Sequence, residues 1–178
     1  MIIGLSGVAR SGKDTVADHL IKNYGFTKVS FADPIRESLL RLNPTISVAG
    51  HYMSLATAVR LIGWEELKTQ SEDIRELMQR MGTEVGREMF YEDIWVDAAL
   101  NKITPDMKVV IADVRYPNEA DAIQKSGGKL WRIERPGVGP ANGHPSESAL
   151  DLYKFRIRLA NEGTLEDLWK KVDLELDK

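Results

Sequence analysis

Short apolar runs alternate along the chain with longer segments in which apolar residues recur every three or four positions. The short runs are either continuous or strictly alternating, which is typical of strands, and the longer segments show the period of a helix. The predicted strands are Met1–Leu5, Thr27–Phe31, Lys108–Ala112, Lys129–Ile133 and Phe155–Leu159. In the last run apolar residues alternate with arginines, which predicts a strand at the edge of the sheet.

The helical segments have recognisable ends. Helices are predicted over Lys13–Tyr24, from Pro34 onward, and over Glu72–Met81, Pro117–Ser126 and Thr164–Leu176. Asp33 is a suitable N-cap with a proline directly after it, and Thr164 and Asp167 have the spacing of a capping box. Because strands and helices alternate, the sheet is predicted to be parallel with right-handed crossovers.

One stretch, Pro44–Gln70, departs from this alternation. It holds an apolar segment of helical period over Leu55–Ile62, which ends in a break at Gly63. We interpret the stretch as a helical insertion. No linker rich in Pro, Gly and Ser divides the chain, so a single domain over residues 1–178 is predicted.

The composition narrows the class of protein. The chain has 178 residues without cysteine and a formal net charge of -3, with a sequence pI of about 5.7. The lack of thiols excludes disulfides and thiolate zinc sites, and the acidic balance argues against a nucleic-acid polymer as partner. The apolar runs are far shorter than the ~20 residues of a membrane-spanning helix, and the N-terminus lacks the basic region of a signal peptide. We therefore expect no membrane partner and a cytoplasmic location.

A phosphate-binding loop is the strongest motif. Gly7, Gly12 and Lys13 have the GxxxxGK spacing, directly between the first predicted strand and the first predicted helix. In this context backbone N–H groups surround an anion, the helix N-terminus adds to their field, and the lysine binds the β- and γ-phosphates. The residues expected to bind ATP here are Gly7, Ala9, Arg10, Ser11, Gly12, Lys13, Asp14 and Thr15.

The position that usually binds Mg²⁺ departs from the motif. Asp14 stands where serine or threonine is usual, and Thr15 follows it. Either the Asp14 carboxylate holds the ion, directly or through water, or Thr15 takes this role. Asp113 ends a hydrophobic strand, where an acidic residue either orders the water around Mg²⁺ or caps the next turn. Asp14, Thr15 and Asp113 are therefore the candidate metal ligands.

Among proteins with such a loop, a small-molecule kinase fits best. A GTPase needs Asn-Lys-x-Asp, and the nearest string, at Asn101, lacks the aspartate. ATP and a phosphorylated acceptor together bring about six negative charges, so several cations must lie close to them. Arg10, Arg36 and Arg115 lie in the loop or just after predicted strands, where open α/β sheets bind ligands.

Charged residues near these positions have more than one interpretation. Asp33 either accepts the proton of the attacking phosphate or orients that phosphate, or it only caps its helix, or it combines these roles. Arg115 either binds the acceptor or lies on the surface. Arg132 and Arg135 lead into a Gly- and Pro-rich loop with the composition of a lid. Arg132 also fits a solvent-facing strand residue, so Arg135 is the better candidate.

Three further positions carry weaker expectations. Arg75 and Gln79 lie one helical turn apart and form either a solvated face or a site for the acceptor phosphate and base. The backbone at Asn161, after the last strand, either packs on the adenine ring or simply makes a turn. His144 has no partner at metal-ligand spacing, so it is expected to make a polar loop contact.

Taken in order, these residues resemble phage-type deoxynucleoside monophosphate kinases. The similarity is carried by Ser6–Thr15, Phe31–Arg36, Arg75–Glu84, Asp113–Asp121, Arg132–Gly137, His144–Leu150 and Asn161–Leu168. It implies transfer of the γ-phosphoryl group of ATP to a dNMP, giving dNDP and ADP with Mg²⁺, in the host cytoplasm if the chain is a phage product. It also implies that the loop binds ATP, that Arg36, Arg75 and Arg115 lie near the acceptor, that Arg132 and Arg135 lie in the lid, and that Asn161 lies near adenine.

The expected architecture is a three-layer α/β P-loop NTPase fold with a five-stranded parallel sheet, a helical acceptor-binding insertion and a lid loop. The core is expected over residues 1–43 and 106–178, the helical acceptor-binding region over about 34–104, and the lid over about 134–150. The expected catalytic residues are Lys13, Asp33, Arg115 and Arg135, the expected acceptor-binding residues are Asp33, Arg36, Arg75, Gln79 and Arg115, and Arg132 and Asn161 are expected on the ATP side. A kinase similar to animal phosphomevalonate kinase or dephospho-coenzyme A kinase, and a non-catalytic ATP-binding regulator, stay open as alternatives, as does a homodimer.

Overall fold

The structure, a computed structural model, describes residues 1–139 and 149–177. The chain divides into two compact units: unit 1 comprises Met1–Ser30 and Asn101–Lys178, and unit 2 comprises Phe31–Leu100. Most of the region that the sequence assigns to acceptor binding falls in unit 2. The domain boundaries drawn from the sequence stay a prediction.

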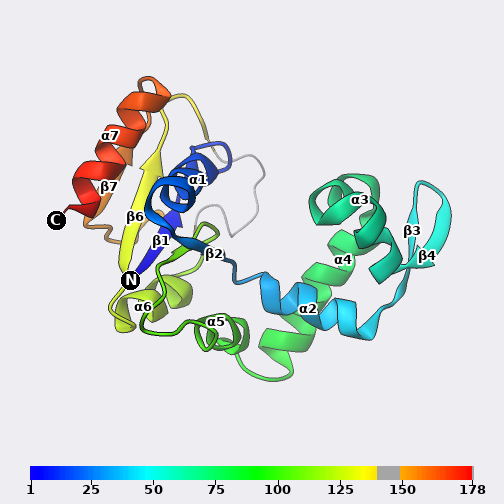
Figure 1. Cartoon of the computed structure of the whole chain (residues 1–178). Coiled ribbons are helices and arrows are strands. Elements are labelled where there is room, and N and C mark those ends of the chain that lie inside the picture. Colours follow the sequence, from blue (N-terminus) through cyan, green and yellow to red (C-terminus); the bar gives the residue numbers. More distant parts are fainter. Residues whose placement is uncertain (140–148, 178) are drawn as a thin grey trace. The chain divides into compact units, whose positions relative to one another are not determined.

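Unit 1 is built on a parallel sheet of five strands in the order β2-β5-β1-β6-β7 (Figure 1). The strands are β1 (Ile2–Ser6), β2 (Thr27–Val29), β5 (Val109–Ile111), β6 (Lys129–Glu134) and β7 (Ile157–Ala160). β1 lies at the centre, where Gly4 pairs with Ile111 on one side and with Leu130 on the other. The predicted parallel sheet is confirmed, and β7 is an edge strand, as its alternation predicts.

Helices cover both faces of this sheet. The helices of unit 1 are α1 (Lys13–Tyr24), α6 (Pro117–Lys125) and α7 (Leu165–Leu176). α1 and α7 pack on the face that carries the buried side chains of Ile3 and Leu5. α6 covers the opposite face, where Gly4 leaves room for Ile123: a Cβ on Gly4 would lie 2.7 Å from Ile123 Cδ1. These three layers and the phosphate-loop motif make a P-loop NTPase α/β fold, as predicted.

The predicted helix starts are only partly right. At α7, Thr164 N donates to Asp167 Oδ2 at 3.0 Å and Asp167 N donates to Thr164 Oγ1 at 3.2 Å, which confirms the capping box. Asp33 is not an N-cap, because α2 (Asp33–Leu42) already includes it and Ala32 is the cap residue. A proline is tolerated anywhere in a first helical turn, where backbone N–H groups have no partner within the helix. Asp33 therefore places its carboxylate in the first turn, where the helix dipole favours negative charge.

Unit 2 has a core of its own. Its elements are α2, β3 (Thr45–Val48), β4 (His51–Ser54), α3 (Leu55–Gln70), α4 (Glu72–Arg80), the π-helix η1 (Met81–Glu88) and α5 (Ile94–Leu100). Its buried residues include Leu39, Ile46, Leu55, Leu67 and Ile74. Residues of α2, β3, α3 and α4 thus bury one apolar cluster within this unit.

The prediction that Pro44–Gln70 is a helical insertion is wrong in its first half. β3 and β4 form an antiparallel hairpin there. Ala49 and Gly50 make its turn with φ angles of 49° and 81°, and positive φ at both positions matches the twist of the flanking strands. The second half is helical as predicted, and the break falls at Gly63, whose φ of 76° and ψ of 164° interrupt α3.

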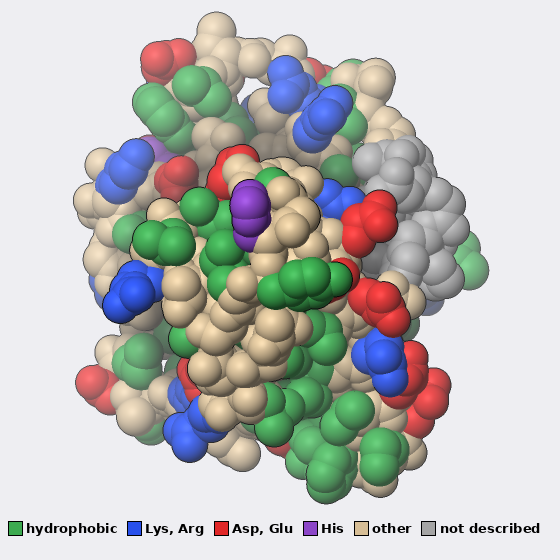
Figure 2. Space-filling model, turned by 90° about the vertical axis from the view of Figure 1, so that its right-hand side faces the viewer, with side chains coloured by type: hydrophobic (Ala, Val, Ile, Leu, Met, Phe, Trp, Pro, Cys, Tyr) green, Lys and Arg blue, Asp and Glu red, His purple; other side chains and the backbone are tan. Residues whose placement is uncertain are grey.

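Among the described residues, no helix has both the length and the apolar character needed to span a membrane. Acidic and basic side chains are interspersed on the face drawn in Figure 2. This mixture reflects the near balance of 24 basic and 27 acidic residues in the chain.

Candidate functional site

The predicted phosphate loop connects β1 to α1 within unit 1. Its turn closes through a hydrogen bond of 3.2 Å from Ser11 N to Val8 O. Arg10 and Gly12 take left-handed conformations, with φ angles of 63° and 109°. Alternation of left- and right-handed residues turns backbone N–H groups toward a common centre, and the N-terminus of α1 begins directly at Lys13. The loop therefore has the backbone shape of an anion-binding concavity.

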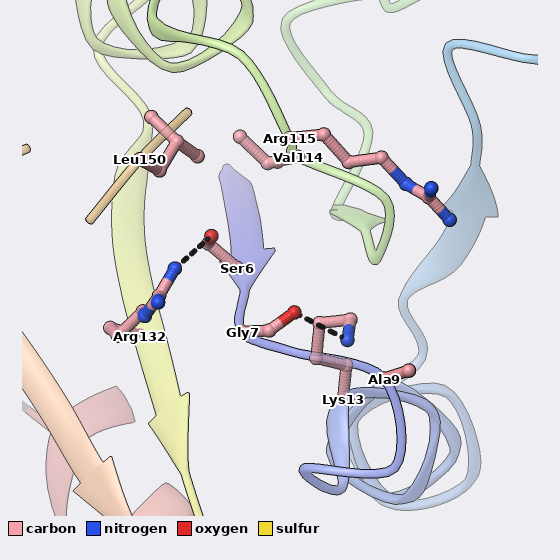
Figure 3. A pocket seen from close by; sticks show the side chains of 8 residues that line it. All are labelled: Ser6, Gly7, Ala9, Lys13, Val114, Arg115, Arg132 and Leu150. Atoms are coloured by element: carbon pink, nitrogen blue, oxygen red, sulfur yellow. Dashed lines mark hydrogen bonds between the residues drawn. The ribbon is translucent and has the colours of Figure 1, made fainter. Parts of the chain in front are cut away.

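Lys13 folds back over this loop. Its Nζ donates to Gly7 O and to Val8 O, both at 2.7 Å, and Figure 3 shows the side chain beside Gly7 and Ala9. A phosphate oxygen, being anionic, is a stronger acceptor for an ammonium group than a backbone carbonyl. The lysine thus lies where a phosphate chain in the loop would take over its hydrogen bonds.

The loop has no room for side chains at its glycines. A Cβ on Gly7 would collide with the Ile133 carbonyl oxygen, and one on Gly12 would lie 2.5 Å from Asn161 Nδ2. Ser11 is fully buried, and its Oγ has no hydrogen-bond partner among the described residues. Because an unpaired buried hydroxyl is costly, the Ser11 side chain fits a site that receives acceptor oxygens from a bound phosphate.

A small cavity beside the loop gathers cationic side chains. Lys13, Arg115 and Arg132 line its volume of about 50 Å³, together with Ser6 (Figure 3). Arg132 lies in β6 with its side chain only 13% exposed, and it donates to Ser6 Oγ at 3.2 Å and to Asp151 Oδ1 at 3.0 Å. Arg115 follows β5 and is exposed. This concentration of positive charge favours phosphate groups.

A larger cavity of about 500 Å³ also reaches Lys13. Its lining includes Arg10, Thr15, Arg135 and the side chain of Leu165, and its volume lies in the range of small-molecule sites. Asn161 lines this cavity too, but its Nδ2 donates to Ser11 O at 2.9 Å. The amide is thus engaged by the phosphate loop.

The candidate metal ligands have different surroundings. Asp14 is exposed, and its Oδ1 lies 3.0 Å from the Nζ of Lys28. Thr15 is half-buried on the wall of the larger cavity. Asp113, just after β5, accepts a hydrogen bond of 2.5 Å from Ser30 Oγ, a contact that fixes its carboxylate at the end of the sheet.

The expected acceptor residues other than Arg115 lie in unit 2. The Arg36 guanidinium lies 3.5 Å from Asp33 Oδ1 and 3.1 Å from Glu65 Oε1. Arg75 donates from Nε to Lys68 O at 2.5 Å. Gln79 lies one turn after Arg75 on α4, and both are exposed. Asp33 and Arg36 are therefore neighbours in space as well as in sequence.

No local sequence pattern identifies the groups that hold Arg132. Ser6 ends β1 directly before the loop motif, and this position does not mark it as a partner of Arg132. Asp151 is an isolated acidic residue without periodic context. Phe155 was expected only as an edge-strand residue, and its ring centre lies 5.6 Å from the Arg132 guanidinium carbon. Only the fold brings these groups together.

Part of the predicted lid lies outside the described residues. This applies to residues 140–148, and with them to His144. Arg135 is described; it is exposed and begins a turn in which Val138 N donates to its carbonyl oxygen.

The comparisons with known proteins point to one family. A family model described as deoxynucleotide monophosphate kinase matches residues 1–59 and 52–172. A mimivirus protein (Acanthamoeba polyphaga mimivirus) named putative deoxynucleotide monophosphate kinase is 32% identical over 193 residues, covering 97% of this chain and 94% of that protein. The deoxynucleotide monophosphate kinase of Enterobacteria phage T4 is 23% identical, covering 96% of each chain. That of Escherichia phage RB69 is 24% identical, covering 97% of this chain and 98% of its own.

Proposed function

Because the chain belongs to the deoxynucleotide monophosphate kinase family, we propose that its Gly7–Thr15 loop binds the phosphates of ATP. The chain is a phosphotransferase that converts a deoxynucleoside monophosphate to the diphosphate. The family decides against the phosphomevalonate-type, dephospho-coenzyme A-type and non-catalytic alternatives. The observation that carries the site assignment is the cavity at the loop, where Lys13, Arg115 and Arg132 lie together.

Several loop residues bind the triphosphate in this proposal. Lys13 Nζ exchanges the carbonyls of Gly7 and Val8 for phosphate oxygens, and Ser11 Oγ gains the acceptor that it lacks. Phosphoryl transfer needs little covalent chemistry from the protein, so positioning and charge stabilisation account for most of the catalysis. Arg132 is already held in place by Ser6 and Asp151, and therefore offers its charge without reorganisation.

The acidic and hydroxyl groups at the loop fit Mg²⁺. In the described part of the chain, no group of three or more His, Asp or Glu could hold a metal alone, and Mg²⁺ commonly takes one or two carboxylates besides water and phosphates. Thr15 and Asp113 are the residues that would hold it, and Asp14 would first have to leave Lys28. When bound, Mg²⁺ neutralises charge on the phosphates.

The acceptor-binding residues stay proposals within their own units. In unit 1 we propose Arg115 as a contact of the dNMP phosphate, and in unit 2 we propose Arg36, Arg75 and Gln79 as acceptor-binding residues. We propose that Asp33, whose Oδ1 lies 3.5 Å from the Arg36 guanidinium, orients the acceptor phosphate, and that Arg135 contributes positive charge from the start of the predicted lid. The named relatives are viral, which supports a host cytoplasm as the place of action.

A coupled ADP-release assay tests this function. The wild type is offered dAMP, dCMP, dGMP and dTMP, and in parallel phosphomevalonate and dephospho-coenzyme A. We expect turnover with dNMPs alone and a loss of at least ~10²-fold in kcat for Lys13→Ala, through lost charge stabilisation. Lys22→Ala removes the same charge from an exposed position on the same helix and should leave kcat unchanged. Near-normal turnover of Lys13→Ala would refute the loop assignment.

A further inference from the structure

Asn161 makes two contacts that join the far edge of the sheet to the phosphate loop. Its backbone N–H donates to Glu134 O at 2.7 Å, which ties the residue to the end of β6. Its side-chain Nδ2 donates to Ser11 O at 2.9 Å. A carbonyl oxygen only accepts hydrogen bonds, so the NH₂ end of the amide must face Ser11.

Through the geometry of the peptide bond, this contact fixes the direction of the Gly12 N–H. The Ser11–Gly12 peptide is planar and trans, so the Ser11 carbonyl and the Gly12 N–H point in opposite directions. When Asn161 fixes the carbonyl on its own side, the Gly12 N–H is fixed away from Asn161. Gly12 is also the residue at which a Cβ would lie 2.5 Å from Asn161 Nδ2, so the amide packs tightly against the loop at this peptide.

We propose that Asn161 is a positioning residue for phosphate binding: its amide holds the Ser11–Gly12 peptide so that the Gly12 N–H faces the phosphates of ATP. This inference rests on the proposed ATP site. In this role the Asn161 side chain affects binding of the phosphates by holding the loop. A residue that recognises the base would instead contact adenine. The two roles predict different kinetics.

The test compares Asn161→Ala and Asn161→Asp with the wild type. Asn161→Asp keeps the shape but replaces the donor by an oxygen that repels the Ser11 carbonyl. Glu162→Gln is the matched control, because Glu162 is the next residue of the same loop and its exposed carboxylate pairs with Lys171 at 3.6 Å. Thermal melting verifies that each variant is folded. If Asn161→Asp does not fold, Asn161→Ala carries the test.

The first readout separates phosphates from base. We expect kcat/KM for ATP and for GTP to fall by the same factor, about tenfold in Asn161→Ala, the size of a lost hydrogen bond of about 1.4 kcal/mol. The inhibition constant of inorganic tripolyphosphate, which has no base, should rise by a similar factor. A changed ratio of ATP to GTP use, or an unchanged inhibition constant, would overturn the proposal.

The second readout observes the loop directly. In the ¹⁵N-labelled wild type, tripolyphosphate should shift the Gly12 amide resonance, and this shift should be smaller in Asn161→Ala. An equal shift in both proteins would overturn the role of Asn161. Failure of the proposed ATP site gives a different result, because tripolyphosphate would then not inhibit even the wild type and Lys13→Ala would keep its activity.

Discussion

Replacing Gly7 by alanine should disable the phosphate loop through a collision with the backbone. The new Cβ would meet the Ile133 carbonyl oxygen and would lie 2.6 Å from Ser11 Oγ. The Ile133 carbonyl is not free to retreat, because β6 is paired on both sides: Ser6 pairs with Arg132, and Ile133 pairs with Leu159. The loop itself must therefore move.

The cost follows from two contributions. Overpacking against fixed neighbours costs about 1–3 kcal/mol, and an alanine at the φ of 150° found here adds about 1 kcal/mol of backbone strain. We expect Gly7→Ala to lower the free energy of unfolding by about 2–4 kcal/mol. A displacement of about 1 Å in groups that position a substrate can cost ~10²-fold, so kcat/KM for ATP should fall by that factor or more.

Gly25→Ala is the matched control for this variant. Gly25 also has a positive φ, 71°, but a Cβ there would meet nothing within 4 Å. It should lose about 1 kcal/mol by denaturant unfolding and retain its kcat/KM for ATP. If Gly7→Ala were no less stable than Gly25→Ala and used ATP equally well, the collision at the loop would not exist as described.

Three further substitutions have separate readouts. Arg115→Ala should abolish use of the dNMP while ATP affinity by titration changes little, and an equal loss of ATP affinity would place Arg115 on the donor side. The backbone N–H and then the hydroxyl of Thr164 hold the pKa of Asp167 below 3.8. The stabilisation of the fold by the ionised Asp167 is therefore complete above the unfolded-state pKa of about 4, and it is lost as pH falls through the lower folded-state pKa. We expect Asp167→Asn to lower Tm at pH 7 and to show a shallower decline of Tm below pH 4. Burial, and then the hydrogen bond and charge of Asp121, raise the pKa of Tyr153 to about 12. Its stabilisation is therefore complete below pH ~10 and is lost as pH rises toward the folded-state pKa, so melting curves of wild type should decline from pH ~10 to 12 in a step that Tyr153→Phe lacks.

The sheet and the phosphate loop could be predicted because their determinants are local. β1 and β5 come from near-continuous apolar runs, and such runs are typical of strands that helices cover on both faces. The loop motif combines glycines that tolerate positive φ with a lysine at fixed spacing, so sequence and backbone geometry specify each other. The alternation of Phe155, Ile157 and Leu159 with arginines likewise identified the edge strand.

The hairpin in unit 2 could not be predicted, because its turn uses an unusual residue. Ala49 takes a left-handed conformation with φ 49°, a region that alanine rarely adopts, so the usual Asn-Gly or Gly-Gly signature is missing. The π-helix after α4 contacts a residue further along the chain. Trp95 Nε1 donates to Gly82 O at 2.8 Å and its ring fills the space beside Gly86. No local sequence pattern predicts a contact between residues this far apart in the chain.

The contacts of the candidate site residues could not be predicted from the sequence either. The sequence predicts Arg132 either as a lid residue or as a solvent-facing strand residue. Its contacts with Ser6 and Asp151 depend on segments that meet only after folding. For Asn161 the sequence predicts either a backbone contact with adenine or a simple turn, and it does not predict the contact of the side chain with the Ser11 carbonyl. The sequence thus indicates candidate site residues, but not which atoms they contact.

The strand order also determines when β1 can pair during synthesis of the chain. Both neighbours of β1, namely β5 and β6, come after unit 2 in the chain. At about 5–20 residues per second on the ribosome, β1 waits on the order of ten seconds for its first partner. A nascent chain that stops before Val109 therefore carries the complete sequence of the loop without the strands that give the loop its shape.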